Sequence, residues 1–239
     1  MTSLSFFVGV IGNIISVLLF LSPLGTFWRI VKRRSTEEFE SLPYICTLLN
    51  SALWTYYGVT KPGSLLVATV NGFGVVVEIV YVTLFLVFAP PRIRAKTAIF
   101  VAILDVGFLG AAILITRFVL HGDTVRIDVI GFLCAGLNIV MYSSPLAAMK
   151  TVVTAKSVEY MPFLLSLFLS LNGGIWTFYA VLVKDFFLGV PNGAGFLLGA
   201  AQLVLYAIYR NPKSSQKISQ DLEDQSQHKH LLPSSTPSE

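Results

Sequence analysis

Long stretches without a formal charge dominate this sequence and constrain its fold more than any other feature. Five stretches of at least 20 residues contain no Asp, Glu, Lys or Arg, and two further stretches contain a single acid each. A helix needs about 20 mostly apolar residues to cross a bilayer, so the pattern predicts seven transmembrane helices. The predicted helices cover Leu4–Trp28, Ser41–Thr60, Pro62–Pro91, Thr97–Thr116, Val129–Met149, Tyr160–Val183 and Phe186–Tyr209.

The composition argues against the other fold classes. Charged residues make up 13% of the chain, against about 25% in an ordinary soluble domain, which disfavours a soluble enzyme and a disordered protein. Strands of a membrane barrel are about 10 residues long with strict alternation, and these stretches do not alternate. The two cysteines, Cys46 and Cys134, lie inside apolar stretches and are expected to be buried thiols. The predicted class is an all-α membrane protein.

Lys and Arg are distributed unequally between the two sides of the predicted bundle. Four follow the first helix, three the third, two the fifth and four the seventh, whereas the loops of the opposite side hold four in total. Cytosolic loops are enriched in Lys and Arg, so the C-terminus is predicted to be cytosolic and the N-terminus to face outside or a lumen. The topology of the chain in the lipid bilayer therefore accounts for the excess of basic residues behind the net charge of +4. No nucleic-acid partner is expected.

The chain contains an internal repeat, the signature of a duplicated structural unit. Three short motifs in its first third recur 121 or 122 residues later, and the flanking helices match with them. The motif pairs are Ser22-Pro23 with Ser144-Pro145, Asn50–Tyr57 with Asn172–Tyr179, and Asn71-Gly72 with Asn192-Gly193. Helices 1–3 and 5–7 are therefore two copies of one three-helix unit, and helix 4 has no counterpart.

This arrangement predicts a 3+1+3 organisation. Residues 1–91 form the first three-helix repeat, 92–120 the linker helix and 121–210 the second repeat. Three helices reverse the side of the membrane and the fourth restores it, so the two bundles are parallel, and binding sites in such proteins lie at the interface between repeats. The polar tail, residues 211–239, cannot bury enough apolar surface to fold and is predicted to be disordered.

Two aromatic and two amide residues are the candidate substrate-binding residues. Trp54 and Trp176 occupy equivalent places in helices 2 and 6, and Asn71 and Asn192 in helices 3 and 7. A buried amide is unfavourable without a partner. Indole faces pack against the C–H face of a sugar, and amides both donate to and accept from hydroxyls, so the four residues favour a sugar site. The alternative is that they only anchor helices at the interface and join them.

The predicted helix ends contain residues suited to gating. Proline weakens a helix locally, and four prolines fall near the cytosolic ends of helices 1, 2, 5 and 6. They are Pro23, Pro43, Pro145 and Pro162. We interpret them as hinges of a cytosolic gate, although proline also simply starts helices. Tyr57 and Asp185 approach the outer end and are candidates for an outer gate.

Two acids lie within predicted helices, and such residues are functional candidates by default. Glu78 is the candidate for proton coupling, yet Gly199 replaces it in the second repeat, and a structural acid is an equal alternative. Asp105 lies on the unpaired helix and is read as structural. The chain has no phosphate-binding loop, no metal-binding motif and no nucleophile–base set, so neither an enzyme nor a cofactor is expected.

These residues together resemble the SWEET (MtN3/saliva) family of plant sugar facilitators, over almost the whole chain up to Arg210. The motifs that carry the resemblance are Gly9-Val-Ile-Gly12-Asn13, Leu21-Ser-Pro23, Lys32-Arg-Arg-Ser35-Thr36-Glu37, Leu42-Pro43-Tyr44, Thr69-Val-Asn71-Gly72, Ser144-Pro145-Leu146, Lys156-Ser157-Val-Glu159-Tyr-Met-Pro162-Phe163 and Pro191-Asn192-Gly193. Parallel repeats are described for this family. Ser35-Thr-Glu-Glu-Phe and the segment from Ser41 to Gly58 are most similar to its vacuolar branch.

The resemblance implies a passive uniporter with alternating access, with the two Asn residues holding the sugar, the two Trp residues flanking it, and the prolines and the Tyr–Asp pair as its gates. It also implies four positions that set substrate size, which are Leu19, Asn50, Met141 and Asn172 here. Large residues at these positions resemble the hexose pattern, so fructose and glucose are the expected substrates and sucrose is an alternative. Homo-oligomers and a vacuolar membrane are implied, with the plasma membrane as the alternative location.

Two other functions compete with this interpretation. The first is a related transporter for amino acids, or one coupled to protons. The Pro-Gln pairs typical of those relatives are absent, because Leu24 follows Pro23 and Leu146 follows Pro145. The second is a seven-helix receptor, which has no reason to duplicate its first and last thirds.

Overall fold

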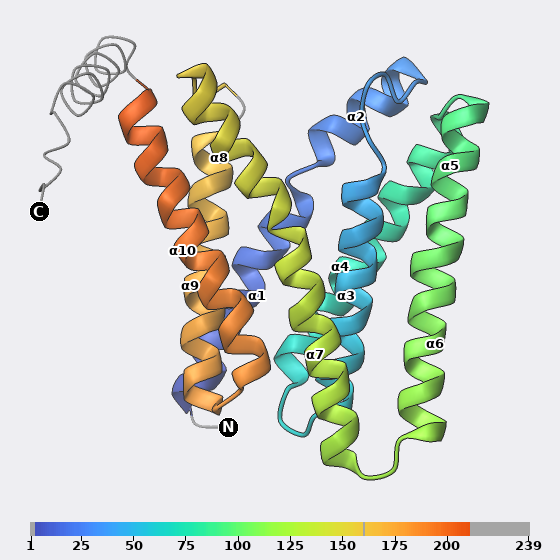
Figure 1. Ribbon diagram of the computed structural model, residues 1–239, viewed down its shortest axis with the longest axis vertical. Coiled ribbons are helices and arrows are strands. Elements are labelled where there is room, and N and C mark those ends of the chain that lie inside the picture. Colours follow the sequence, from blue (N-terminus) through green and yellow to red (C-terminus); the bar gives the residue numbers. More distant parts are fainter. Residues whose placement is uncertain (1–2, 160, 211–239) are drawn as a thin grey trace, which may run out of the picture.

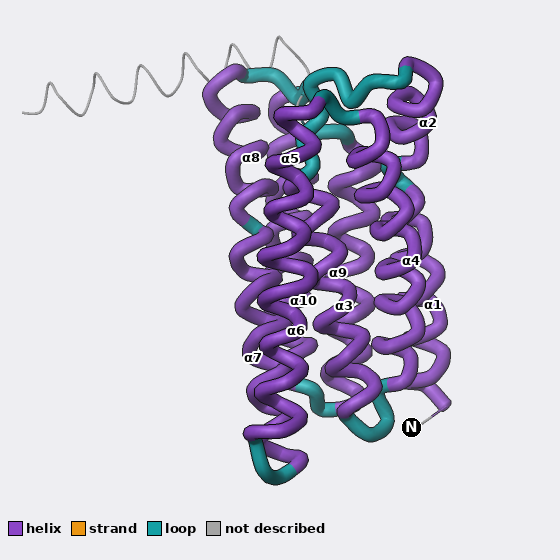
Figure 2. The backbone as a smooth tube through the Cα atoms, turned by 90° about the vertical axis from the view of Figure 1, so that its right-hand side faces the viewer, coloured by secondary structure: helices purple, strands orange, loops and turns teal. Residues whose placement is uncertain are grey.

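The computed structural model describes residues 3–159 and 161–210 and is built of helices throughout this part (Figures 1 and 2). The tail predicted to be disordered, residues 211–239, lies outside the described residues. The helices are α1 (Ser3–Leu21), α2 (Leu24–Arg33), α3 (Leu42–Thr60), α4 (Leu65–Phe88), α5 (Pro91–Val101), η1 (Ala102–Phe108), α6 (Leu109–Leu114), η2 (Ile115–Val119), α7 (Asp123–Met141), α8 (Ser143–Ala155), α9 (Phe163–Val183) and α10 (Phe186–Tyr209).

Most of these helices satisfy the length and composition of a membrane span. Within the described residues, six single helices or runs of consecutive helices are long and apolar enough to cross a bilayer. The helix α3 is 19 residues long but less apolar, because it carries Asn, Ser, Thr, Trp and Tyr side chains. Many of its residues are buried among the other helices, so α3 does not depend on an apolar surface. The predicted class, an all-α membrane protein, is confirmed.

The first helix of each repeat is broken where the sequence predicted a single helix. Ser22 and Pro23 form a turn between α1 and α2, and Tyr142 separates α7 from α8. Pro23 has no backbone N–H to continue the helix. Both extensions also end alike, because Arg34 and Lys156, which are 122 residues apart, close α2 and α8 in the left-handed region with φ of 50° and 52°.

The two repeats pack in the same order and are related by an approximate two-fold axis. In the first repeat α4 lies between α1 and α3, and in the second α10 lies between α9 and the α7–α8 pair. Across the interface, α1 packs against α9 and α3 packs against α7. Each contact therefore joins the first helix of one repeat to the second helix of the other, which is the arrangement expected for two parallel copies around one central site (Figure 1).

The linker helix stands at the side of the first repeat. The helical segment from α5 to η2 contacts α3 and α4 along one face and leaves large apolar side chains such as Ile103, Val106 and Phe118 exposed. Similar residues cover the outside of the other long helices. Exposed apolar surface of this extent fits the hydrocarbon of a bilayer rather than water.

The loop between α2 and α3 is held by an ion-pair cluster. Arg29 and Arg33 lie 2.5 Å and 2.7 Å from the two carboxylate oxygens of Glu37. The hydrogen bond from Arg29, together with that from Arg33, lowers the pKa of Glu37. The cluster fixes the chain as it leaves the α2 end of the first repeat.

Candidate functional site

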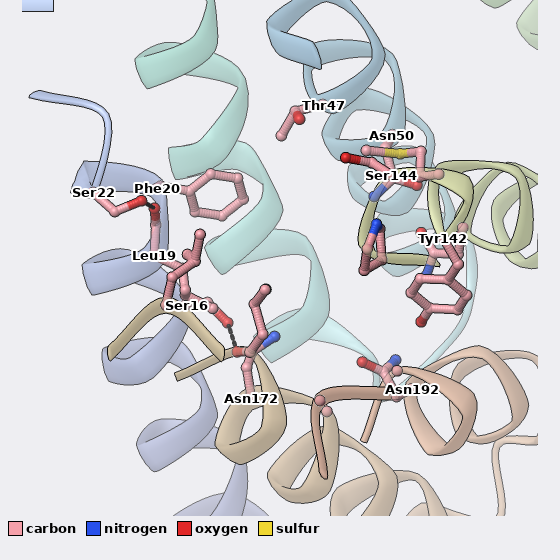
Figure 3. Close-up of a pocket in the computed structure, with 18 of the residues that line it drawn as sticks. Ser16, Leu19, Phe20, Ser22, Thr47, Asn50, Tyr142, Ser144, Asn172 and Asn192 are labelled. Carbon is pink, nitrogen blue, oxygen red and sulfur yellow. Dashed lines mark hydrogen bonds between the residues drawn. The ribbon is translucent and has the colours of Figure 1, made fainter. Parts of the chain in front are cut away.

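A cavity of about 640 Å³ lies between the two repeats. Its walls come from α1, α3 and α4 of the first repeat and from α7, α8, α9 and α10 of the second. All eight residues that the sequence assigned to substrate binding and substrate size line it. Figure 3 shows Leu19 and Phe20 of α1, Asn172 of α9 and Asn192 of α10 around this space.

The two amides of the predicted site make matching hydrogen bonds. Asn71 donates from Nδ2 to the carbonyl of Val67 at 2.9 Å, and Asn192 donates to the carbonyl of Leu188 at 2.8 Å. Each side chain is thereby fixed to its own helix by one N–H. The other N–H and the carbonyl oxygen of each amide stay available to a ligand in the cavity.

The two tryptophans are held by the opposite repeat. Trp176 donates from its indole N–H to Ser16 Oγ at 3.0 Å, and Trp54 approaches Asn138 Oδ1 at 3.5 Å. Ser16 and Asn138 are themselves 122 residues apart. Each indole also packs edge-on against the tyrosine three residues later, with ring centroids 5.3 Å apart in both cases. These contacts fix the ring planes at the base of the cavity.

The four predicted size-determining residues form two pairs by repeat position, Leu19 with Met141 and Asn50 with Asn172. Asn172 accepts a hydrogen bond of 2.6 Å from Ser16, whereas Asn50 Oδ1 is buried and has no protein partner (Figure 3). An unpaired buried carbonyl is unfavourable. The two equivalent amides are therefore held differently, although both residues line the cavity.

One end of the cavity is open, and we call it the proline end. All four predicted gate prolines line the cavity there. Pro43 and Pro162, at the beginnings of α3 and α9, are exposed to solvent, as is Ser144. Pro23 and Pro145 lie at the breaks of the first helices. The prolines thus surround the mouth of the cavity, at positions where the helices begin or are interrupted.

The other end is closed by a cluster that we call the latch, made of Tyr57, Lys61 and Asp185. The hydroxyl of Tyr57 donates to both carboxylate oxygens of Asp185, at 2.9 Å and 3.1 Å. Lys61 Nζ lies 2.7 Å from Asp185 Oδ2 and 2.9 Å from the Tyr57 hydroxyl. Asp185 also accepts from the N–H of Leu188 at the start of α10. The latch joins α3 of one repeat to α10 of the other.

The two membrane acids lie in different surroundings. Glu78 of α4 lines the cavity, at a position that Gly199 occupies in the second repeat. Asp105 lies on the linker segment η1 instead. Among the described residues that line the cavity, Glu78 is the charged one.

Comparisons with known proteins identify the family. The chain matches the family described as "Sugar efflux transporter for intercellular exchange" over residues 6–92 and 128–214, once for each repeat. The chain belongs to the SWEET (MtN3/saliva) family. The predicted membership is therefore confirmed, and this is a family of transporters rather than enzymes.

Individual relatives agree over most of their length. The chain is 62% identical to the bidirectional sugar transporter SWEET17 of Arabidopsis thaliana, and the alignment covers 89% of this chain and 88% of the relative. It is 59% identical to SWEET16 of the same plant, over 88% of this chain and 92% of the relative. A solved eukaryotic SWEET transporter superposes with a TM-score of 0.81 at 40% identity, covering 86% of this chain and 96% of that one.

Sequence reasoning missed three residues of this SWEET site. Ser16 and Asn138 escaped because they are small or scattered polar residues on helix 1 and helix 5, yet they share the repeat offset of 122 residues and could have been found by it. Lys61 was counted only as a loop charge. Its place four residues after Tyr57, one helical turn away, is the signal that could have revealed it.

The chemistry of the cavity is that of hydrogen bonding and stacking. Its polar groups are mainly amides and hydroxyls, and among the described residues no group of three or more His, Cys, Asp or Glu side chains is arranged to hold a metal ion. Such a lining suits an uncharged molecule with many hydroxyls and an apolar face.

Proposed function

We propose that this SWEET-family chain is a passive, bidirectional sugar uniporter for hexoses, chiefly fructose and glucose. The observation that carries the proposal is the symmetric cavity. The amides of Asn71 and Asn192 and the indoles of Trp54 and Trp176 line it, with the closed latch at one end and the open proline end at the other. The names of the relatives, bidirectional sugar transporters, support the same activity.

The residues favour a sugar over a charged solute. An amino acid needs a cation for its carboxylate, and no Lys, Arg or His lines the described cavity. A sugar needs donors and acceptors for its hydroxyls, and Asn71, Asn192 and Asn50 supply both. It also needs flat apolar surface, for which Trp54 and Trp176 are suited.

Transport would proceed by alternating access. In the described conformation the latch is closed and the proline end is open. To open the cavity toward the other side, the hydrogen bonds of the latch must break and the helices must close the cavity at the four prolines. The unequal distribution of Lys and Arg supports a cytosolic proline end and C-terminus, so this conformation would face the cytosol.

Several finer features belong to the same proposal. Leu19, Met141, Asn50 and Asn172 would narrow the cavity to one sugar ring and so set the preference for hexoses over sucrose. The resemblance of Ser35–Phe39 and of the segment from Ser41 to Gly58 to the vacuolar branch of the family supports the vacuolar membrane, with the plasma membrane as the alternative. The division into residues 1–91, 92–120 and 121–210, and assembly into homo-oligomers, stay predictions.

Uptake of labelled sugars into proteoliposomes tests the proposal. Purified full-length protein should give saturable uptake of fructose and glucose, weaker uptake of sucrose, and no dependence on a pH gradient. A need for the gradient would replace the uniporter by a proton-coupled transporter. Folded protein that moves no sugar, but binds an amino acid or another ligand, would overturn sugar transport itself.

A further inference from the structure

Glu78 is buried in the membrane region without a protein partner. The residue is 3% exposed, its Oε2 atom is fully buried without a hydrogen bond, and none of the ion pairs among the described residues includes it. Burying a polar group without a partner is unfavourable, and burying a carboxylate is more so. Asp105 shares this lack of a partner but does not line the cavity, so it is the position of Glu78 at the cavity that distinguishes it.

The repeat shows that Glu78 belongs to one half of the molecule only. Tyr44, Glu78 and Tyr81 of the first repeat correspond to Ser166, Gly199 and Gln202 of the second, at offsets of 122 and 121 residues. Gly199 cannot be replaced by a larger residue, because a Cβ atom there would lie 2.8 Å from the Cα of Ser170. The carboxylate is therefore a specific feature of one wall rather than a repeated packing element.

The cavity that Glu78 lines also carries polar side chains from the second repeat. Ser166 and Gln202, on helices of the second repeat, line the same cavity and are otherwise buried, with exposed fractions of 2% and 5%. Hydroxyl and amide groups on one wall and a carboxylate on the other provide both donors and acceptors. This is the lining that a molecule with several hydroxyls requires.

Glu78 and the amide of Asn71 lie at different heights along α4. Glu78 follows Asn71 by seven residues, which is about two helical turns on the same face and a rise of about 10 Å. That rise exceeds the width of one sugar ring. A hexose between Asn71 and Asn192 therefore does not reach Glu78, and the carboxylate serves a second position nearer the proline end.

We propose, on the basis of the sugar transport proposed above, that Glu78 anchors a second sugar-hydroxyl site between the proline end and the central amides. Its carboxylate accepts hydrogen bonds from two hydroxyls of a sugar that enters or leaves through the proline end. The residue lines the cavity although its Oε2 atom is buried beneath the cavity surface, so the sugar meets the part of the carboxyl group that faces the cavity. The second site makes the pathway unequal in its two halves, although the fold is nearly symmetric.

The test combines transport kinetics with thermal stability for Glu78→Met, which keeps a similar volume without the charge. Loss of a hydrogen bond to a charged group should raise the KM for glucose about tenfold or more. Removing an unpaired buried acid should at the same time keep or raise the Tm of the sugar-free protein. Glu78→Gln, which keeps an acceptor and the shape, should raise the KM less, and it replaces the Met variant if that variant does not fold.

A series of deoxyglucoses identifies the contact itself. The wild type should discriminate against at least one deoxy sugar, and Glu78→Met should lose that discrimination while Asp105→Asn, a membrane acid outside the cavity, keeps it. An unchanged KM with a lowered Tm in Glu78→Met would overturn the second site in favour of a structural role. If Glu78→Met lost only the part of sugar uptake that a pH gradient drives, the second site would be overturned in favour of proton coupling. Wild-type protein that moves no sugar would instead overturn the proposed function.

Discussion

The latch offers the sharpest quantitative prediction, through the substitution Tyr57→Phe. Phenylalanine keeps the ring against Trp54 but removes the hydroxyl that donates to Asp185 and accepts from Lys61. A hydrogen bond to a buried charged group contributes about 2 kcal/mol. Because the bond exists only when the latch is closed, its loss should increase the population open at the latch end about 30-fold.

A reporter thiol measures that population. Leu188→Cys introduces a thiol on the cavity side of the latch, where the native side chain is 4% exposed, in a background in which Cys46 and Cys134 are replaced by Ala. A membrane-impermeant maleimide is added to sealed vesicles from the latch side only. The labelling rate should rise about 30-fold with Tyr57→Phe while the open state stays the minor one.

The repeat provides a matched control for the latch. Tyr179 is the counterpart of Tyr57, 122 residues later, and its hydroxyl is buried with no partner. Tyr179→Phe removes the same atom without breaking a bond, so it should leave the labelling rate unchanged. Equal labelling in the two variants, or no increase with Tyr57→Phe, would refute the assignment of the latch.

Three further predictions concern the site, its size and the α2–α3 loop. Asn192→Ala and Trp176→Ala should each abolish sugar flux in proteoliposomes while the amount of folded protein in the membrane is unchanged; normal flux in either would remove that residue from the site. The double change Leu19→Val and Met141→Val should enlarge the cavity and raise sucrose uptake relative to glucose, and an unchanged ratio would contradict their role in substrate size. The wild type should be more heat-stable than Glu37→Gln at neutral pH, because two arginines pair with the ionised carboxylate and lower its pKa. That advantage should disappear as the pH falls through the lowered pKa, and an advantage that persists in acid would show that charge does not hold the loop.

The sequence was sufficient to predict the architecture. Membrane spans follow from uncharged stretches, and a duplicated unit follows from motifs such as those around Trp54 and Trp176. The first inference is possible because unpaired charge is unfavourable inside a bilayer. The second is possible because two copies of one sequence adopt the same fold. Membrane-span counting also has a limit, because α3 is buried by other helices and does not need the apolar surface of its neighbours.

The residues that complete the site could not be predicted in the same way. Pro145 points to a break in the first helix of the second repeat, but it lies three residues after Tyr142 and so does not mark the end of α7 itself. The hydrogen bond from Trp176 to Ser16 joins residues 160 positions apart, and its existence depends on how two helices pack. Gly199 takes the place of Glu78 in the second repeat, and only the packing of α4 shows that Glu78 lines the cavity.

The central claim is that one sugar site between the repeats opens to either side of the membrane in turn. Counterflow tests it most directly: proteoliposomes containing the full-length protein are loaded with unlabelled glucose, and trace labelled glucose is added outside without any ion gradient. The account predicts a transient accumulation of label above the external level, because unlabelled glucose inside competes with the label for the site and slows its exit. Uptake that only approaches equilibrium, with no overshoot and no saturation, would contradict alternating access and indicate an open pore.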